Sequence, residues 1–317
     1  MPSQHAQTTR VNDGIVAIDT EFARSLLDAS HLIVERGRAA FVDTGTNYSV
    51  PLLLDALKQL DVDAADVDFV FLTHVHLDHA GGAGLLMQQL PNARCVVHPR
   101  GAPHMIDPTK LVAGTVAVYG EQLVREMYGE ILPIDASRID VADDGQWFEL
   151  CGRAMQAFYT EGHARHHYCL HDPNSKGVFT GDSFGVSYRE LDTAAGEFIF
   201  PSSTPVQFDP VEAHKSVDRI MALEPEQVYL THYSRVRDLD RLAMDMHEGI
   251  DAYVAMALAH ADDANRTELL QATMFEYITG RLLKHGYKGD REMMASTLDF
   301  DIKINTQGLE VWLNRRV

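Results

Sequence analysis

Cysteine and positive charge are both scarce in this sequence of 317 residues. The three cysteines, Cys95, Cys151 and Cys169, are an odd number, lie far apart and form no CxxC pair. Neither a disulfide framework nor a thiolate zinc knuckle is therefore indicated, and a reducing, cytoplasmic compartment is expected. We expect all three thiols to be small buried apolar side chains.

Negative charge dominates the composition. Lys and Arg number 27 against 46 Asp and Glu, a formal net charge of -19, and such a field repels phosphate backbones and anionic lipid. No apolar run approaches the roughly 20 residues that a spanning helix needs. The segment from Met1 to Arg10 is polar and has no signal-peptide core. We therefore expect a chain that is not exported and that has no nucleic-acid or membrane partner.

Segments rich in Val, Ile and Phe, bounded by turns, occur in two series and predict strands. The expected strands cover 14–19, 31–35, 39–43, 67–72 and 93–98 in the first series, and 145–150, 154–160, 167–171, 177–180 and 227–231 in the second. Helical spacing of apolar residues predicts helices over 51–60, 81–90, 105–132 with interruptions, and 210–223. The fold class indicated is α/β.

The character of the chain changes near residue 240, after which apolar stripes with helical spacing prevail. We place a domain boundary there, with 1–240 as the catalytic domain and 241–317 as a helical C-terminal extension. Asn265 followed by Glu268 resembles a capping box, and Gly286 is placed to stop the second helix.

The richest motif is a histidine cluster that follows the expected strand 67–72. It contains His74, His76, Asp78 and His79, in the pattern His-x-His-x-Asp-His. Neutral imidazole is a common ligand of divalent metals, and alternate residues of an extended loop point to the same side. A tetrahedral catalytic zinc uses three protein side chains, so four candidates within six residues suggest two ions that share one loop.

Further candidate ligands stand shortly after other expected strands. His163 follows the strand 154–160, Asp182 follows 177–180, and His232 follows 227–231. Turns at the ends of neighbouring strands converge in space, so residues far apart in the sequence can meet there. We expect these three side chains to complete a dinuclear centre.

The order of these motifs resembles the metallo-β-lactamase superfamily of dinuclear hydrolases, over roughly residues 14 to 235. The family pattern begins with Asp-Thr-Gly, matched by Asp43-Thr44-Gly45, and continues with His-x-His-x-Asp-His, Gly-His, Gly-Asp and a final His. The resemblance implies an αββα sandwich and assigns Asp43 to orient a ligand. It also implies a ligand set: His74, His76 and His163 on the first metal, Asp78, His79 and His232 on the second, and Asp182 bridging both. Zinc is the expected metal, with iron or manganese left open.

The sequence departs from particular members of that superfamily. True β-lactamases lack the bridging aspartate that Asp182 would supply, so antibiotic hydrolysis is not expected. Glyoxalase II and many lactonases have Thr-Pro-Gly-His-Thr-x-Gly-His, whereas this chain has Thr160-Glu161-Gly162-His163-Ala164-Arg165-His166-His167. Tyr188 and Tyr233 are candidate hydrogen-bond donors to an oxyanion, and His167 either packs beside the site or hydrogen-bonds to a ligand.

The resemblance implies a metal-dependent hydrolase in which a metal-bridging hydroxide attacks a small ester, thioester or lactone. Asp182 and Asp78 would accept the proton. Three alternatives stay open: an iron-dependent oxidoreductase of the persulfide dioxygenase type, a phosphodiesterase, and a sensor that binds a ligand without turning it over. A small-molecule substrate is expected in the enzymatic cases, and a homo-oligomer is left open.

Overall fold

The computed structural model describes residues 5–203 and 206–316. Residues 1–4, which begin the polar N-terminus discussed above, and residues 204–205 and 317 lie outside these ranges. The chain forms two compact units. The first contains Met1–Tyr159, His166–Gly181 and Val228–Arg235, and the second contains Thr160–Arg165, Asp182–Gln227 and Val236–Val317. The boundary expected near residue 240 stays a prediction.

The first sheet of the first unit has seven strands in the order β1-β2-β3-β4-β5-β6-β7. Their bounds are β1 Thr8–Asn12, β2 Ile15–Asp19, β3 Ala29–Glu35, β4 Arg38–Val42, β5 Val67–Leu72, β6 Arg94–Val97 and β7 Ile139–Val141. β1 to β4 form an antiparallel meander, and β4 to β7 run parallel. Parallel neighbours need crossover connections, which the helices between β4 and β7 provide.

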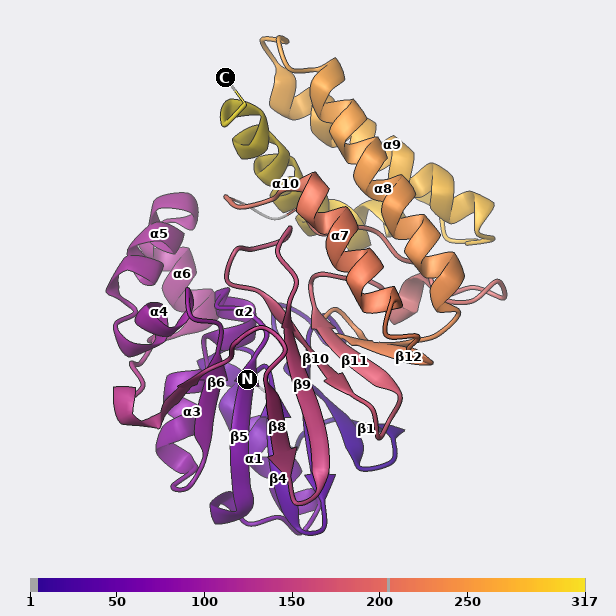
Figure 1. Cartoon of the computed structure of the whole chain (residues 1–317). Coiled ribbons are helices and arrows are strands. Elements are labelled where there is room, and N and C mark those ends of the chain that lie inside the picture. The colour runs from indigo at the N-terminus through magenta and orange to yellow at the C-terminus, as the bar shows by residue number, and fades with distance from the viewer. Residues whose placement is uncertain (1–4, 204–205, 317) are drawn as a thin grey trace. The chain divides into compact units, whose positions relative to one another are not determined.

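The second sheet has six strands in the order β13-β12-β11-β10-β9-β8. Their bounds are β8 Trp147–Leu150, β9 Arg153–Tyr159, β10 Tyr168–Asp172, β11 Gly177–Gly181, β12 Gln227–Leu230 and β13 Ser234–Val236. Aromatic rings join the two sheets face to face. Phe71 of β5 meets Phe148 of β8 edge-on with ring centroids 5.4 Å apart, and His31 of β3 meets Phe179 of β11 at 5.4 Å. The two sheets therefore form a sandwich (Figure 1).

Six α-helices of the first unit lie in the connections of the first sheet. Their bounds are α1 Val50–Gln59, α2 Leu77–Ala80, α3 Ala83–Gln89, α4 Ala102–Ile106, α5 Thr109–Tyr119 and α6 Glu121–Tyr128. Pro51 stands in the first turn of α1, where its missing N–H costs nothing. Leu53 and Leu57 of α1 and Leu86 of α3 belong to one buried cluster with Phe41 of β4, so these helices cover a face of the first sheet.

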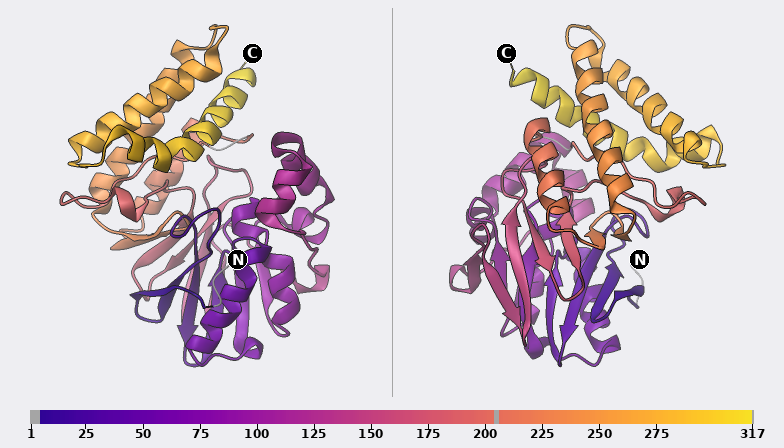
Figure 2. Two further views of the ribbon diagram at one scale, coloured as in Figure 1. Left: turned by 180° about the vertical axis from the view of Figure 1, so that it is seen from behind. Right: turned by 45° about the vertical axis from the view of Figure 1, so that its right-hand side comes forward.

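The second unit is built around four helices, shown in orange to yellow in Figure 2. Their bounds are α7 Pro210–Met221, α8 Leu239–Ala259, α9 Arg266–Lys284 and α10 Arg291–Asn314. Asp209 caps α7 by accepting hydrogen bonds from two backbone N–H groups of its first turn. α7 packs on α8, and α8, α9 and α10 pack on one another. In the described ranges no helix is long and apolar enough to cross a membrane.

The α/β sandwich with C-terminal helices is confirmed, and three details of the expectation are wrong. Cys151 is exposed in the turn between β8 and β9, whereas Cys95 and Cys169 are buried as expected. Asn265 forms no side-chain cap at the start of α9 in the described structure, so the expected capping box is absent there. The strands β1, β7 and β13 and the separate helix α10 were not expected from the sequence.

Candidate metal centre

The histidine motif lies where β5 ends and α2 begins, in the first unit. His74 is fully buried in the connecting segment, and its Nε2 lies 2.9 Å from Nδ1 of His76. His79 is in the single turn of α2, and its ring centroid lies 4.0 Å from that of His74. The short helix lets Asp78 and His79 turn away from the extended segment while staying close to it. The carboxyl end of β5 thus presents four side chains with metal-ligand chemistry.

A second strand end brings His232 to the same place. The backbone N–H of Ala29 donates to the carbonyl of Thr231 at 2.8 Å, which joins the start of β3 to the residue just after β12. One ligand atom each of Asp78, His79 and His232 lies within 4.8 Å of the others. The Oδ2 of Asp78 is 3.7 Å from Nε2 of both histidines. The first unit therefore gathers a carboxylate and two imidazoles around one point.

A buried carboxylate holds His79 in this orientation. Oδ2 of Asp43 lies 2.8 Å from Nδ1 of His79, and Asp43 also accepts hydrogen bonds from the backbone N–H of Thr73 at 2.8 Å and the hydroxyl of Thr231 at 2.9 Å. A carboxylate on one ring nitrogen fixes the tautomer and directs the other nitrogen to a metal. This contact places Asp43 where it can orient His79, and the role toward a metal that the family resemblance implies stays a prediction.

Asp28 lies against His232, and the sequence analysis missed it. Nδ1 of His232 is 2.7 Å from Oδ1 of Asp28 and 3.2 Å from the carbonyl oxygen of Leu27, with which it forms a hydrogen bond, and this leaves Nε2 of that ring facing Asp78. Burial raises the pKa of Asp28 to about 6, and the neighbouring His232 opposes the rise. No sequence pattern predicts that Asp28 orients a histidine, because it is a single aspartate before a strand and His232 lies about two hundred residues further along the chain.

The second unit gathers the other two expected ligand residues. Nε2 of His163 lies 3.5 Å from Oδ2 of Asp182, which also accepts a hydrogen bond from the Ser202 hydroxyl at 3.4 Å. Gly162 has φ +128°, and a Cβ there would lie 2.4 Å from the backbone nitrogen of Ala213 on α7. Only glycine allows this close approach, which places the next residue, His163, beside the start of α7.

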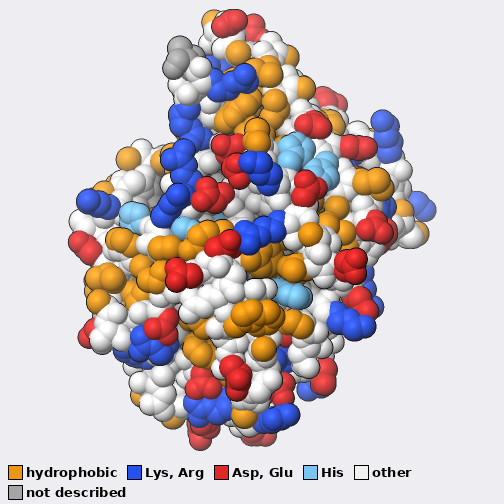
Figure 3. Space-filling model, viewed as in Figure 1, with side chains coloured by type: hydrophobic (Ala, Val, Ile, Leu, Met, Phe, Trp, Pro, Cys, Tyr) orange, Lys and Arg blue, Asp and Glu red, His pale blue; other side chains and the backbone are white. Residues whose placement is uncertain are grey.

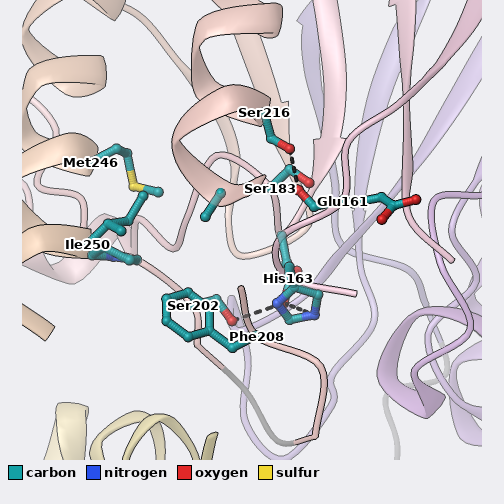
Figure 4. Close-up of a pocket in the computed structure, with 11 residues that line it drawn as sticks. Glu161, His163, Ser183, Ser202, Phe208, Ser216, Met246 and Ile250 are labelled. Carbon is teal, nitrogen blue, oxygen red and sulfur yellow. Dashed lines mark hydrogen bonds and ion pairs between the residues drawn. The ribbon is translucent and has the colours of Figure 1, made fainter. Parts of the chain in front are cut away.

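His163 and Asp182 also line a pocket within the second unit (Figure 4). The pocket is narrow, with free space for about one water molecule. One side is apolar and the other is polar. Phe208, Met246 and Ile250 supply apolar surface, and Glu161, Ser183, Ser202 and Ser216 supply polar groups. Such a mixture suits a small, largely uncharged group with a few polar atoms.

Tyr188 does not fit the suggested oxyanion role. It is fully buried in the second unit, and its hydroxyl donates to the carboxylate of Asp301 at 3.0 Å. His167 packs beside the histidine motif, with its ring stacked on that of His74 at 4.9 Å. Tyr233 is buried in the first unit, and its suggested role stays a prediction.

The donor set fits a divalent metal of the first transition row. Imidazole nitrogens with one carboxylate oxygen suit zinc and iron, and both rings beside Asp78 have their other nitrogen fixed by a buried carboxylate. An imidazole that is fixed in this manner loses little freedom on binding a cation. The chemistry of these residues therefore agrees with a metal centre and does not by itself select the metal.

The sequence profile of the metallo-beta-lactamase superfamily matches residues 29–232. A metallo-beta-lactamase fold-containing protein, ST1585 of Sulfurisphaera tokodaii, is 28% identical over 52% of this chain and 60% of its own length. An atrochrysone carboxyl ACP thioesterase of Aspergillus fumigatus is 25% identical over 68% of this chain and 57% of its own length. A hydroxyacylglutathione hydrolase of Maricaulis maris is 25% identical over 63% of this chain and 62% of its own length. The chain thus spans less than two thirds of the length of these relatives.

Solved structures share the fold over a larger part of the chain. The crystal structure of ST1585 from Sulfolobus tokodaii has a TM-score of 0.62 at 21% identity and covers 97% of this chain and 99% of its own. The structure titled peroxy diiron species of chemotaxis sensor ODP has a TM-score of 0.54 at 15% identity, covering 77% of this chain and 94% of its own. At these identities the likeness concerns the fold alone.

Proposed function

Because the chain belongs to the metallo-beta-lactamase superfamily, we propose that it is a dinuclear metal-dependent hydrolase that acts on a small ester, thioester or lactone. The observation that carries the proposal is the geometry around Asp78. Two imidazoles, His79 and His232, have their Nε2 atoms 3.7 Å from its carboxylate and their Nδ1 atoms held by buried aspartates. Such preorganisation is typical of catalytic metal ligands rather than of ordinary core histidines.

The proposed ligand set follows the family pattern. The residues that would hold the two metal ions are His74, His76, His163, Asp78, His79, His232 and Asp182. Support comes from the order of the motifs within the matched residues 29–232 and from the clusters that each unit forms on its own. Zinc is the metal that we propose, since imidazole and carboxylate ligands without thiolates are common in catalytic zinc sites.

Two divalent ions held by these residues would supply hydroxide at neutral pH and would polarise a carbonyl oxygen. The protein contributes orientation and proton transfer. Asp43 and Asp28 fix the tautomers of His79 and His232, while Asp78 and Asp182 have carboxylate oxygens that can accept the proton released during attack. The apolar residues Phe208, Met246 and Ile250 beside His163 and Asp182 would contact the acyl group of the substrate.

Among the three substrate classes we favour a thioester. One relative is named a thioesterase and another a hydroxyacylglutathione hydrolase. We also propose a small-molecule substrate without a nucleic-acid or membrane partner and a cytoplasmic location, on the basis of the net charge of -19 and of three cysteines that form no disulfide within the described residues.

An iron-dependent oxidoreductase of the persulfide dioxygenase type is the second candidate. It is favoured by the likeness in fold to a chemotaxis sensor whose structure is titled a peroxy diiron species. The same nitrogen and oxygen ligands accept iron. Metal content separates the two candidates when it is measured together with oxygen consumption and ester turnover.

The test uses the full chain purified without added metal, assayed for metal content and for hydrolysis of thioester, ester and lactone substrates. Asp182→Asn and Asp78→Asn should each lower kcat/KM by about 100-fold or more, the scale of lost proton transfer. Asp299→Asn is the matched control, since Asp299 is exposed on α10 and pairs only with Lys303 in the described contacts. Equal rates in the wild type and both site variants would refute the hydrolase, and iron with oxygen uptake would favour the second candidate.

A further inference from the structure

Tyr119 and Tyr128 are the last residues of α5 and α6 in the first unit. Tyr128 is 6% exposed and Tyr119 is half-buried. Neither hydroxyl has a hydrogen-bond partner among residues 5–203 and 206–316. Buried polar groups in proteins are normally hydrogen-bonded, so the hydroxyl of Tyr128 in particular is a group whose partner is to be sought outside the chain.

Both hydroxyls lie close to Asp78, one of the proposed metal ligands. Burial raises the pKa of Tyr119 to about 12, and the negative charge of Asp78 adds to the rise. Burial also raises the pKa of Tyr128, with further contributions from Asp78 and Asp28. A charge acts on a pKa in this way only from nearby, and Asp28 is the residue that lies against His232. Tyr128 is therefore close to two acidic residues of the candidate metal centre.

Two packing contacts agree with this position of α6. The ring of Tyr128 stacks on that of Phe22, with the ring centroids 5.6 Å apart. A Cβ on Gly81, two residues after His79, would lie 3.5 Å from Cδ1 of Ile131. The chain that follows α6 thus packs on the end of α2, the helix that carries Asp78 and His79.

The helices that carry the two tyrosines have an apolar surface. α5 contains a single charged residue, Lys110, and Val118 of α5 and Leu123 of α6 are exposed. Apolar side chains gather on the surface that α4, α5 and α6 form, at the left of Figure 3. A hydrogen bond is stronger in apolar surroundings than in water. At neutral pH both phenols keep their protons, as their raised pKa values require, and so can donate.

We propose that Tyr119 and Tyr128 bind the substrate, and that their hydroxyls donate hydrogen bonds to the oxygen of the carbonyl group that is attacked. The inference rests on the proposed hydrolase function and adds two residues to its site. Negative charge develops on this oxygen during the attack. A donor at that point therefore stabilises the transition state more than the bound substrate, and its loss lowers kcat.

The test compares Tyr119→Phe and Tyr128→Phe with the wild type in the hydrolysis of thioester, ester and lactone substrates. Each variant keeps the ring and removes only the hydroxyl. Each should lower kcat/KM by about 10–100-fold, the effect of one lost hydrogen bond to a charged oxygen, with most of the loss in kcat. The unfolding temperature should stay the same or rise, because the hydroxyl has no partner in the described part of the chain.

Tyr229→Phe is the matched control. Tyr229 is also buried in the first unit, and its hydroxyl accepts a hydrogen bond from Nδ2 of Asn12 at 2.9 Å. This control should lose stability and keep its kcat/KM. The inference would be overturned, with the hydrolase intact, if both site variants kept the kcat/KM of the wild type. A decrease in kcat/KM that came with a lower unfolding temperature would also overturn it, since that is the result of a packing role.

A binding measurement separates this inference from the hydrolase function. The probe is methyl pentyl ketone, a neutral carbonyl compound that cannot be hydrolysed, and its binding to the full chain is measured by calorimetry. Tyr128→Phe should bind it about 2–10-fold more weakly than the wild type, the effect of one lost hydrogen bond to a neutral oxygen. If the wild type hydrolyses none of the substrates, this result decides: weaker binding by Tyr128→Phe would support the inference and refute the hydrolase, whereas equal or absent binding would overturn both.

Discussion

Replacing Asp43 by asparagine should weaken metal binding at the cluster around His79 while leaving the first unit folded. Asp43 has φ +58°, a left-handed conformation that asparagine tolerates better than most residues, so the backbone can be kept. The amide retains one oxygen that can accept from the N–H of Thr73. Its other oxygen is replaced by an uncharged NH₂ group. In the wild type that oxygen lies 2.8 Å from Nδ1 of His79 and 2.9 Å from the hydroxyl of Thr231, and the NH₂ group can accept a hydrogen bond from neither.

The size of the effect follows from these contacts. A hydrogen bond to a charged group contributes about 1.5–3 kcal/mol, and Asp43 is buried, so two mismatched contacts should lower the free energy of unfolding by about 3–6 kcal/mol. The decrease in metal affinity is a separate effect, and it arises because the ring of His79 is no longer held in one tautomer. Removing such an orienting partner typically costs about 10–100-fold in metal affinity.

Two assays separate the effects. Urea unfolding in the presence of a chelator reports the stability of the metal-free protein, and competition with a chromophoric chelator reports the zinc affinity. Asp19→Asn is the matched control, since Asp19 is equally buried in the first unit and accepts from the backbone N–H groups of Glu21 and Leu26, each at 3.0 Å. It should lose stability and keep its affinity. An Asp43→Asn protein that binds zinc as tightly as the Asp19→Asn protein would refute the positioning role.

Three further substitutions test the buried polar groups. Burial lowers the pKa of His31 from 6.5 to about 4. As the pH falls below 6.5, His31 is therefore protonated in the unfolded chain and stays neutral in the folded one, which favours unfolding. The wild type should therefore lose about 2 kcal/mol more than His31→Gln between pH 7 and pH 5 in urea unfolding, and equal losses would contradict this. Arg153→Met leaves the buried Asp172 unpaired and should lower the free energy of unfolding by about 3–5 kcal/mol, which a second change, Asp172→Asn, should partly restore. Tyr188→Phe removes the hydroxyl that donates to Asp301 and should cost about 1–3 kcal/mol of stability with kcat unchanged; a large fall in kcat at unchanged stability would return Tyr188 to the active site.

The sequence predicted the central strands and missed the elements whose apolar pattern is weak. β1 lies at the edge of its sheet, and three of its five residues are exposed or half-buried in succession. β7 and β13 have three residues each, too few to show a period. α10 buries Asp301 and Asn305 on the same stripe as its leucines, because these polar groups meet Tyr188 and the N–H of Ser203. An apolar stripe interrupted by satisfied polar groups cannot be recognised without its partners.

In the metal centre, too, residues that form a local pattern could be predicted, and residues whose role depends on a distant partner could not. His74, His76, Asp78 and His79 stand within six residues, so their spacing alone indicates metal chemistry. Asp28 stands by itself, and its role arises only because the hydrogen bond between Ala29 and Thr231 places the start of β3 beside the end of β12.

A histidine with no partner on either nitrogen can adopt both tautomers and several rotamers, and restricting it to one of them when a metal binds lowers the affinity. An aspartate beside Nδ1, such as Asp43 beside His79, restricts the ring when the protein folds. Sequence motifs can therefore identify the atoms that bind, whereas how tightly they bind depends on contacts between segments such as Asp28 and His232 that only the tertiary structure brings together.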